Sequence, residues 1–314
     1  MAGIIAAAYA VSLAGFNDYI MSVGVSAAAF VILSAGFNLV YGYGGLVSLA
    51  QVTFWGLGGY TCALLSTRLD WNPWATLPVA GLVALGCGLL VGFASLRLSQ
   101  HAFGIVTLIF SLLMQLVIRD WTSLTRGPMG IPGLPALELP RPWANDSLLL
   151  VSATQFYPLM LTMAVVVLWL LHRVTWSRVG LVLQAIKANE ALAASQGIAV
   201  LRYRLFAFGA SAFVSGVAGG LFVFYLSIAD PTLLDFYYTE SVLVMVIVGG
   251  AGTFWPVVMA SIVFSVVPEL LRLGDQLRLV FYGGVLMAAI LMFPAGVGGW
   301  LARRRLAAWR RPVA

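Results

Sequence analysis

The 49 residues from Tyr19 to Thr67 contain no charged side chain. One membrane-spanning helix needs about 20 predominantly apolar residues, so this stretch is long enough for two spans. Over the whole chain of 314 residues, 61% of the residues are hydrophobic and 9% are charged, whereas about 25% are charged in a typical soluble domain. The sequence therefore predicts an all-α, polytopic membrane protein.

Apolar segments predict about eight to ten transmembrane helices, some short or broken at glycine-rich points, in a single domain that covers residues 1–314. The segments lie near 3–15, 20–41, 45–66, 74–95, 102–118, 156–172, 205–227, 241–252, 255–271 and 279–295. Two of them, 3–15 and 241–252, are too short for a full span, and we expect them to be re-entrant or interfacial. No basic residue precedes Arg68, so we interpret the N-terminal segment as a first short span rather than a cleavable signal peptide.

The basic residues predict the orientation of the chain, because Lys and Arg are enriched in cytoplasmic loops. Of the 17 basic residues, ten lie either in 173–204 or between Arg303 and Arg311. We therefore expect 173–204 and both termini to be cytoplasmic and 119–155 to form a periplasmic loop. An even number of crossings must then follow 173–204, which requires the glycines at 249–252 to break the apolar run in two. The same rule explains the net charge of +6, and no nucleic-acid partner is expected.

Polar groups and glycines inside the apolar runs are the candidates for a translocation pathway. The amides of Asn38 and Gln51 are predicted at membrane depth, where a polar group needs partners and turns away from lipid. A solute contact and an interhelical hydrogen bond are both open for these two residues. Helix packing is the more frequent reason for glycines in such runs. The candidate pathway residues are Asn38, Gly45, Ser48, Gln51, Gly249 and Gly250.

The sequence lacks the motifs of nucleotide, metal and catalytic sites. A Walker A loop requires Gly-Lys before Ser or Thr, and the one lysine, Lys187, follows Ile186. The two histidines, His101 and His172, are far apart in the sequence and near predicted cytoplasmic ends, which favours structural roles over a metal site. We therefore expect no catalytic residue, no metal site and no cofactor bound by this chain.

The segment 173–204 is too polar to span the membrane and too long for a turn. From Gly180 to Gln196 it predicts one helix, because small and apolar residues recur at helical spacing. The residues of that predicted face are Ile186, Glu190, Ala193, Ala194 and Gly197. Such a face can seat closely in a groove of another protein, and an amphipathic helix that lies on the bilayer is the alternative.

The chain resembles the permease subunits of bacterial ABC importers for branched-chain amino acids, of the LivM type. Three stretches carry the resemblance, which covers nearly the whole chain. They are "FNLVYGYGGLVSLAQVTFWGLGGYT", "GLVLQAIKANEALAASQGIAVLRYRLFAFGASAFVSGVAGGLF", and "VLVMVIVGGAGTFWPV" followed by "VPELLR". The chain departs from the family at Ala50 and Gln51, where relatives commonly have a histidine after "SLG", and at "GGAGTFWPV", where they commonly have "GGLGSLWGP".

The resemblance implies a machine of several subunits in the bacterial inner membrane. It comprises a second homologous permease, two cytoplasmic ATPases that bind ATP and Mg, and a periplasmic binding protein that delivers the solute. It also implies that the segment around 180–197 docks on the ATPases. The contact residues assigned in this way are Glu190, Ala194 and Gly197, with Lys187 and Arg178 on the same segment.

The identity of the solute stays open at the level of the sequence. The same permease class resembles transporters of urea, short amides and aromatic acids as well as branched-chain amino acids, and few fixed charges suit a small neutral or zwitterionic solute. The alternative class is a stand-alone secondary transporter, which would couple to an ion through an intramembrane carboxylate or broken-helix carbonyls. The charge-free stretch from Tyr19 to Thr67 and the coupling-like helix count against that class.

Overall fold

The structure is a computed structural model that describes residues 18–140 and 147–270, together with isolated residues and one short stretch between 277 and 300. The predicted segment 3–15 and the basic C-terminus lie outside the described residues. Of the predicted segment 279–295, only isolated positions lie within them.

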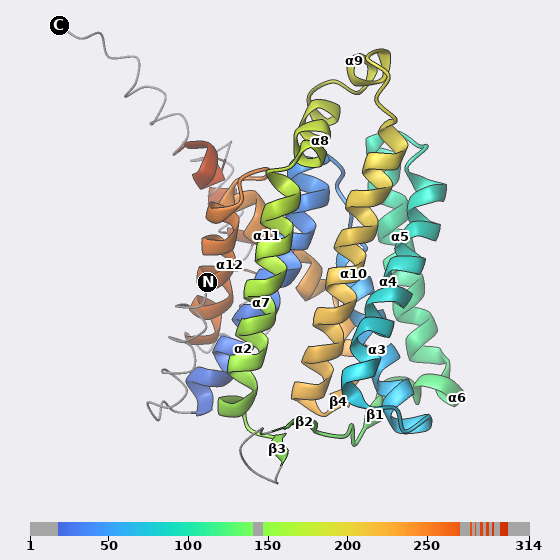
Figure 1. The fold of residues 1–314 in the computed structure, drawn as a ribbon, viewed down its shortest axis with the longest axis vertical. Coiled ribbons are helices and arrows are strands. Elements are labelled where there is room, and N and C mark those ends of the chain that lie inside the picture. The colour runs from blue at the N-terminus through green and yellow to red at the C-terminus, as the bar shows by residue number, and fades with distance from the viewer. Residues whose placement is uncertain are drawn as a thin grey trace, which may run out of the picture.

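The described chain is a bundle of helices aligned along one axis (Figure 1). The long helices are α2 (Asp18–Phe37), α3 (Gln51–Arg68), α4 (Pro73–Ser95), α5 (Gln100–Asp120), α7 (Ala153–Thr175), α10 (Val200–Leu226), α11 (Phe236–Gly249) and α12 (Trp255–Leu270). Each corresponds to one of the apolar segments predicted between residues 20 and 271. Within the described residues, six segments are long and apolar enough to cross a membrane, and α3 and α12 are not among them. The predicted all-α polytopic class is confirmed.

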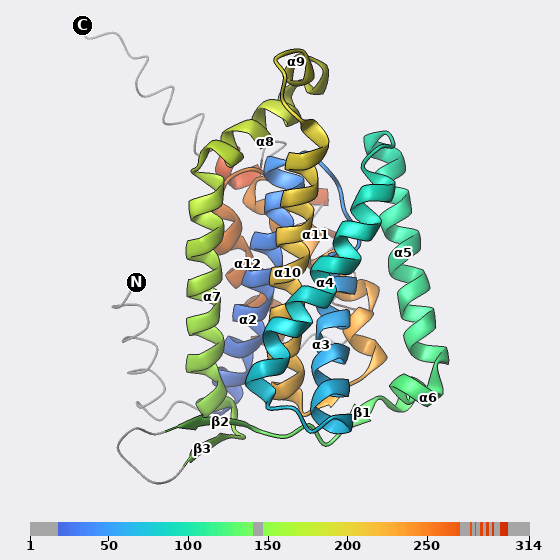
Figure 2. The same ribbon diagram turned by 45° about the vertical axis from the view of Figure 1, so that its right-hand side comes forward.

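Short elements close the two ends of the bundle. One end carries α6 (Thr122–Thr125), η2 (Gly127–Met129), β1 (Ile131–Pro132), β2 (Leu137–Pro140), β3 (Ser147–Leu150), β4 (Ile228–Ala229) and η3 (Pro231–Leu234). Strands β1 and β4 pair antiparallel, as do β2 and β3. The other end carries α8 (Arg178–Ala188) and α9 (Glu190–Ser195), with α9 projecting beyond the bundle (Figure 1, Figure 2). The segments 119–155 and 173–204 therefore lie at opposite ends, as the predicted topology requires.

The predicted break near 42–45 is present, but the second helix begins later than expected. Helix α2 continues as a π-helix, η1 (Asn38–Tyr43), and the chain then runs without helical structure from Gly44 to Ala50. Helix α3 starts at Gln51 rather than near residue 45. Residues 44–50 are not helical, although they lie between two helices of the bundle. Part of their backbone therefore needs hydrogen-bond partners from other helices.

The core of the bundle forms around α10, which packs against α3 and α4. A Cβ atom at Gly58 of α3 would lie 2.0 Å from the carbonyl oxygen of Gly216 in α10. Glycine therefore lets the two backbones touch, as expected for helix association in lipid. In the span of α10, 83% of the residues are buried, whereas in α5 only 17% are buried. Most of the surface of α5 thus faces away from the rest of the chain.

A second break separates α11 from α12, as the charge distribution predicted. Helix α11 ends at Gly249, and Gly250 and Gly252 adopt φ angles of +103° and +92°. Glycine adopts these left-handed conformations at little cost in steric energy, because it has no Cβ atom. The run 241–271 is therefore two helices rather than one.

Candidate functional site

The two helix breaks, about 200 residues apart in the sequence, meet through the side chain of Asn38. Its Nδ2 donates to the carbonyl oxygen of Thr253 at 2.9 Å, and its Oδ1 accepts from the N–H of Gly252 at 2.9 Å. Gly42 lies against this contact, because a Cβ there would be 1.9 Å from Asn38 Oδ1. We call these four residues, Asn38, Gly42, Gly252 and Thr253, the break junction.

A row of polar side chains on α5 supports the non-helical segment 44–50. Gln100 donates to the carbonyl oxygen of Gly45. The hydroxyl of Thr107 accepts from the N–H of Leu49 at 3.1 Å, and the hydroxyl of Ser111 donates to the carbonyl oxygen of Leu49 at 2.8 Å. Irregular backbone at membrane depth persists only where protein or water satisfies it. We call Gln100, Thr107 and Ser111 the α5 ladder.

The α5 ladder was missed in the sequence, although its signal is present there. Residues 100, 107 and 111 recur at spacings of seven and four on one face of an otherwise apolar helix, which places them on a common stripe. The opposite face is exposed and apolar, with Ile105 and Leu112 each more than half exposed. A polar stripe on such a helix predicts a partner with unsatisfied polar groups.

The structure places Gln51 in a packing contact between α3 and α10. Its Oε1 accepts from the hydroxyl of Ser211 at 2.9 Å, its Nε2 donates to the hydroxyl of Ser215, and the residue is 2% exposed. Both ends of the amide therefore have partners within the bundle, which is the interhelical hydrogen bond left open by the sequence. A contact of Gln51 with solute stays a prediction.

The remaining pathway candidates lie at separate places. Ser48 is buried in the non-helical segment, where its hydroxyl accepts from the N–H of Ala50 at 3.3 Å. Gly249 allows a close approach of α11 and α12, since a Cβ there would lie 2.6 Å from the Cα of Val257. Gly250 forms the left-handed turn after α11. Two of the candidates adjoin the segment 173–204: Gly45 lies beside the Lys187 stem, and Asn38 bonds Gly252, whose backbone lies near the Lys187 ammonium.

The predicted single helix from Gly180 to Gln196 is wrong, because the chain breaks at Asn189. Asn189 adopts an extended conformation, with φ −158° and ψ 105°, and its Oδ1 accepts from the N–H of Leu192 at 3.0 Å. Asparagine favours this capping role over a helix interior because its side chain competes for backbone groups. The predicted common face is therefore divided, with Ile186 and Ala193 buried and Glu190 and Ala194 exposed.

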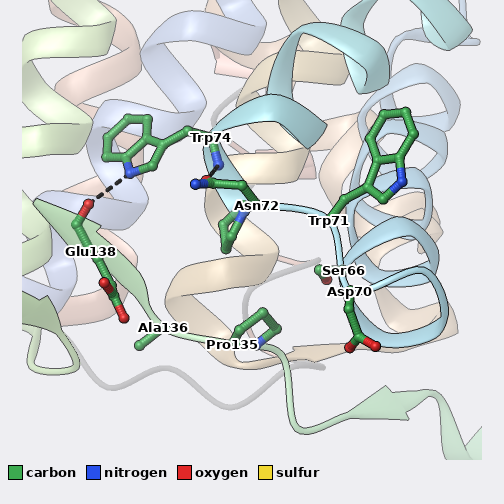
Figure 3. Close-up of a pocket in the computed structure, with 9 residues that line it drawn as sticks. Ser66, Asp70, Trp71, Asn72, Trp74, Pro135, Ala136 and Glu138 are labelled. Carbon is green, nitrogen blue, oxygen red and sulfur yellow. Dashed lines mark hydrogen bonds between the residues drawn. The ribbon is translucent and has the colours of Figure 1, made fainter.

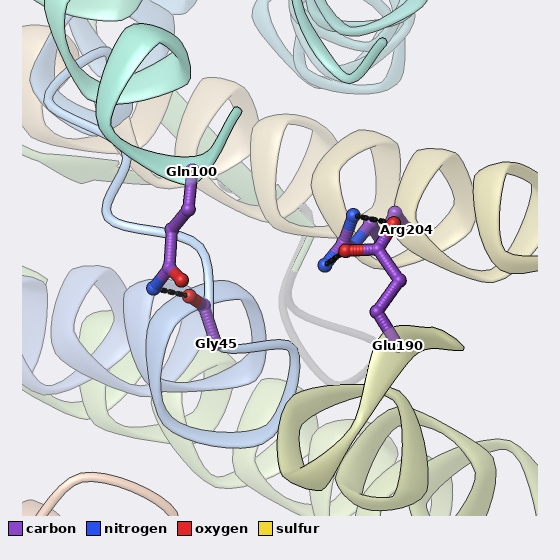
Figure 4. A network of polar contacts seen from close by, with 4 residues as sticks. All are labelled: Gly45, Gln100, Glu190 and Arg204. Carbon is purple, nitrogen blue, oxygen red and sulfur yellow. Dashed lines mark hydrogen bonds and ion pairs between the residues drawn. The ribbon is translucent and has the colours of Figure 1, made fainter. Parts of the chain in front are cut away.

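Glu190 pairs within the chain rather than presenting a free carboxylate. The guanidinium of Arg204, on α10, donates to both oxygens of Glu190 at 2.8 and 2.9 Å (Figure 4). Arg204 is 9% exposed, and a two-pronged pair of this kind fixes the geometry as well as the charge. In this structure the partner of the Glu190 carboxylate is therefore Arg204, and a contact of Glu190 with an ATPase subunit stays a prediction.

Gly197 also has a local explanation. It adopts a φ of +79° just after α9, and no atom would lie within 4 Å of a Cβ at that position. A left-handed glycine after the last turn is a common helix end. The conformation of the helix end is thus sufficient to explain a glycine at this position, and a contact of Gly197 with an ATPase subunit stays a prediction.

Lys187 connects α8 to the break junction. Its Nζ donates to the carbonyl oxygen of Gly42 at 2.6 Å, and its stem packs beside Gly45, where a Cβ would lie 2.9 Å from Lys187 Cγ. Burial lowers the pKa of the Lys187 ammonium below its ordinary value. Arg178, by contrast, lies at the first residue of α8, two and a half turns away by helical geometry.

A cavity of about 420 Å³ lies where these groups converge. The α8–α9 corner, the end of η1, the start of α5 and α10 enclose it (Figure 4). Its lining residues are Tyr41, Gly44, Gly45, Gln100, Ile186, Lys187, Ala188, Asn189, Glu190 and Arg204. The segment 173–204, the start of the non-helical segment 44–50 and Gln100 of the α5 ladder therefore line one polar cavity.

A second cavity, of about 580 Å³, opens at the opposite end of the bundle (Figure 3). Asn72 caps α4 by accepting from the N–H of Trp74 at 2.9 Å, and the indole N–H of Trp74 donates to the carbonyl oxygen of Glu138 at 2.8 Å. The carboxylates of Asp70 and Glu138 lie at its rim. Within 18–140 and 147–270, no group of three or more His, Cys, Asp or Glu residues could hold a metal ion.

Comparison with known proteins gives one family. Residues 19–291 match the family model for the branched-chain amino acid transport system / permease component. The chain is 30% identical over 277 residues to the high-affinity branched-chain amino acid transport system permease protein LivM of Escherichia coli (strain K12), covering 83% of this chain and 65% of that protein. LivM of Salmonella typhimurium (strain LT2) gives the same identity and coverage. The chain thus spans slightly less than two thirds of these relatives, and no solved structure gives a significant match.

Proposed function

Because this chain belongs to the family of permease components of branched-chain amino acid transport systems, we propose that it is the membrane-spanning subunit of an ATP-driven importer for branched-chain amino acids. In this proposal it works with a second homologous permease, two ATPases that bind ATP and Mg, and a binding protein that delivers the solute. The chain itself supplies the path through the membrane and the surfaces on which these partners dock.

The observation that carries the proposal is the protruding α8–α9 end of the bundle. Apolar side chains are exposed there beyond the bundle, with Trp176 75%, Leu181 65% and Leu192 60% exposed. Exposed apolar groups on a rigid protrusion suit burial against another protein. The Glu190–Arg204 pair fixes α9 to α10, so it holds this docking surface in place rather than forming the contact itself.

Charge supports a cytoplasmic position for this end. Its described basic residues are Arg97, Arg173, Arg178, Lys187, Arg202 and Arg204, and Glu190 is an acid among them. The opposite end carries basic residues Arg68, Arg119 and Arg126 and acids that include Asp18, Asp70, Asp120, Glu138 and Asp230. Basic residues are enriched on the cytoplasmic side. We therefore orient α8 and α9 toward the cytoplasm of a bacterial inner membrane and the cavity of Figure 3 toward the binding protein.

The test of docking is co-purification of the partner ATPase subunits with this chain. We expect Leu192→Arg to reduce the recovery of ATPase and solute-stimulated ATP hydrolysis by about tenfold or more, because a charge replaces an apolar contact. Leu149→Arg is the matched control, since Leu149 is 50% exposed at the opposite end, and it should keep ATPase binding. Full recovery with Leu192→Arg would place the docking surface elsewhere.

The test of the transporter class is uptake by the purified chain in liposomes. We expect no uptake by the chain alone, and ATP-dependent uptake when the partner subunits are present. Uptake driven by a proton or sodium gradient with this chain alone would establish a secondary transporter instead. Competition among leucine, urea, a short amide and an aromatic acid in the assembled system would identify the solute class.

A further inference from the structure

Lys187 is placed where the segment proposed to dock on the ATPases meets the interrupted transmembrane helices. Helix α8 carries the residue, while its Nζ reaches the carbonyl oxygen of Gly42 at 2.6 Å in η1. Lys187 is the one lysine of the chain. A cation that binds a carbonyl at the end of a helix satisfies an acceptor that the helix leaves open and interacts favourably with its dipole.

The acceptor of this hydrogen bond lies between the two helix breaks. A Cβ at Gly252 would lie 2.8 Å from the carbonyl oxygen of Gly42 and 3.6 Å from the Nζ of Lys187. The Lys187 ammonium therefore contacts the Gly42 carbonyl, and this carbonyl lies against the backbone of Gly252. Asn38, the first residue of η1, joins the same backbone stretch through its bonds to Gly252 and Thr253. A shift of the ammonium thus acts on both breaks.

A small displacement is enough to change this contact. A hydrogen bond weakens once donor and acceptor separate beyond about 3.2 to 3.5 Å, so the 2.6 Å contact of Lys187 is lost when α8 moves away by about 1 Å. Shifts of about 1 to 2 Å are common when subunits act on one another through helices. Movement of α8 toward the bundle also has an effect. Because the Lys187 stem packs beside Gly45, α8 cannot approach without displacing the non-helical segment 44–50.

We propose that Lys187 is the residue through which movement of α8 reaches the break junction, and that it positions the two helix breaks according to the state of the docked ATPases. This rests on the permease function proposed above. Release of the Gly42 carbonyl frees the end of η1 and the glycine turn at Gly252 together, whereas contact holds both in the arrangement of this structure. Lys187 is a positioning residue, and it does not need to touch the solute.

The experiment compares Lys187→Met with Lys187→Arg in the complete complex reconstituted in liposomes. Methionine keeps an unbranched stem but has no donor, whereas arginine keeps the donors and the charge. Arg97→Met is the control, because Arg97 is a basic residue at the same end that lies over the Phe93 ring, 4.4 Å from its centroid. Uptake, ATP hydrolysis and ATPase co-purification are measured on the same preparations.

We expect Lys187→Met to keep ATPase binding and hydrolysis while uptake falls, so that the ATP consumed per solute rises by about tenfold or more. Lys187→Arg should recover most of the uptake, and Arg97→Met should match the wild type. Hydrogen exchange at 42–45 and 250–253 should respond to nucleotide in the wild type and lose that response in Lys187→Met.

Three outcomes overturn the inference. An unchanged ATP cost in Lys187→Met means that the contact does not transmit movement. Parallel loss of ATPase binding and hydrolysis means that Lys187 acts in docking, and failure of Lys187→Arg to recover uptake means that the donor is not what matters. If the wild-type chain itself binds no ATPase, the permease proposal fails, and that result is seen before any Lys187 variant is measured.

Discussion

Replacing Asn38 with leucine should separate the two helix breaks while keeping the branching and the number of side-chain heavy atoms. Leucine removes the amide donor to the Thr253 carbonyl and the acceptor for the Gly252 N–H. Asn38 is 2% exposed, so water does not readily replace either bond. Both backbone groups are then left without their partner beside the η1 turn.

The cost follows from two lost hydrogen bonds. An interhelical hydrogen bond in a membrane contributes about 0.6 to 2 kcal/mol, and a buried backbone group without a partner costs about 1 to 3 kcal/mol. For two bonds we therefore expect Asn38→Leu to lower the free energy of unfolding by about 2 to 4 kcal/mol. The loss should be concentrated where η1 meets the α11–α12 turn.

The assay combines thermal unfolding in detergent with hydrogen exchange of the Gly252 amide. Ser34→Ala is the matched control, because Ser34 lies one turn earlier on α2, is equally buried, and makes only a 3.4 Å contact with the sulfur of Met245 on α11. Asn38→Leu should speed exchange at Gly252 and lower the melting temperature, and Ser34→Ala should change both far less. Equal behaviour of the two variants, or unchanged exchange at Gly252, would refute the view that Asn38 holds the breaks together.

Three further expectations follow from single contacts. Gly58→Ala should lower the melting temperature far more than Gly86→Ala, because its Cβ would lie 2.0 Å from a carbonyl oxygen of α10, whereas no atom lies within 4 Å at Gly86. Glu190→Lys should destabilise α9 by leaving the buried Arg204 without its partner, at about 1 to 2 kcal/mol, because the Glu190 side chain is 55% exposed and solvent screens the pair; the exchanged pair with Arg at 190 and Glu at 204 should recover part of the loss in a melting assay. Lys187 should react with amine reagents at a lower pH than a lysine of ordinary pKa, because the lowered pKa of its ammonium gives a larger neutral fraction at each pH, and peptide mapping after labelling measures this.

The sequence predicted features that depend on composition and local backbone freedom. Placing both basic segments in the cytoplasm required an even number of crossings between them, and therefore a break in the run 241–271. In the structure, Gly250 and Gly252 make this break with left-handed φ angles. The apolar segments likewise located the helices, because burial in lipid acts on each span separately. The start of α3 was placed too early because four of the five residues 46–50 are apolar, and apolarity does not distinguish a helix from a non-helical segment whose hydrogen-bond partners lie on another helix.

Features that depend on tertiary partners could not be read from the sequence. The role of Glu190 depends on Arg204, which lies on a different helix, and local spacing gave no reason to pair them. Asn189 carried a usable signal, since asparagine favours helix starts over helix interiors, but the periodicity on both sides of it outweighed that signal. The junction at Asn38 involves residues more than 200 positions away, and only the three-dimensional contact reveals it.

The hydrogen bonds of α3 impose an order on its insertion into the membrane. Gln51 depends on Ser211 and Ser215 of α10, and the preceding non-helical segment depends on the α5 ladder. Both partner helices are synthesised after α3, which is itself not among the segments apolar enough to cross a membrane alone. Residues 44–68 therefore have no fully satisfied place in lipid while the ribosome is still producing α5. Helix α3 must stay beside protein or water until α5 and α10 arrive, so its final membrane position is acquired late in synthesis rather than in the order of the chain.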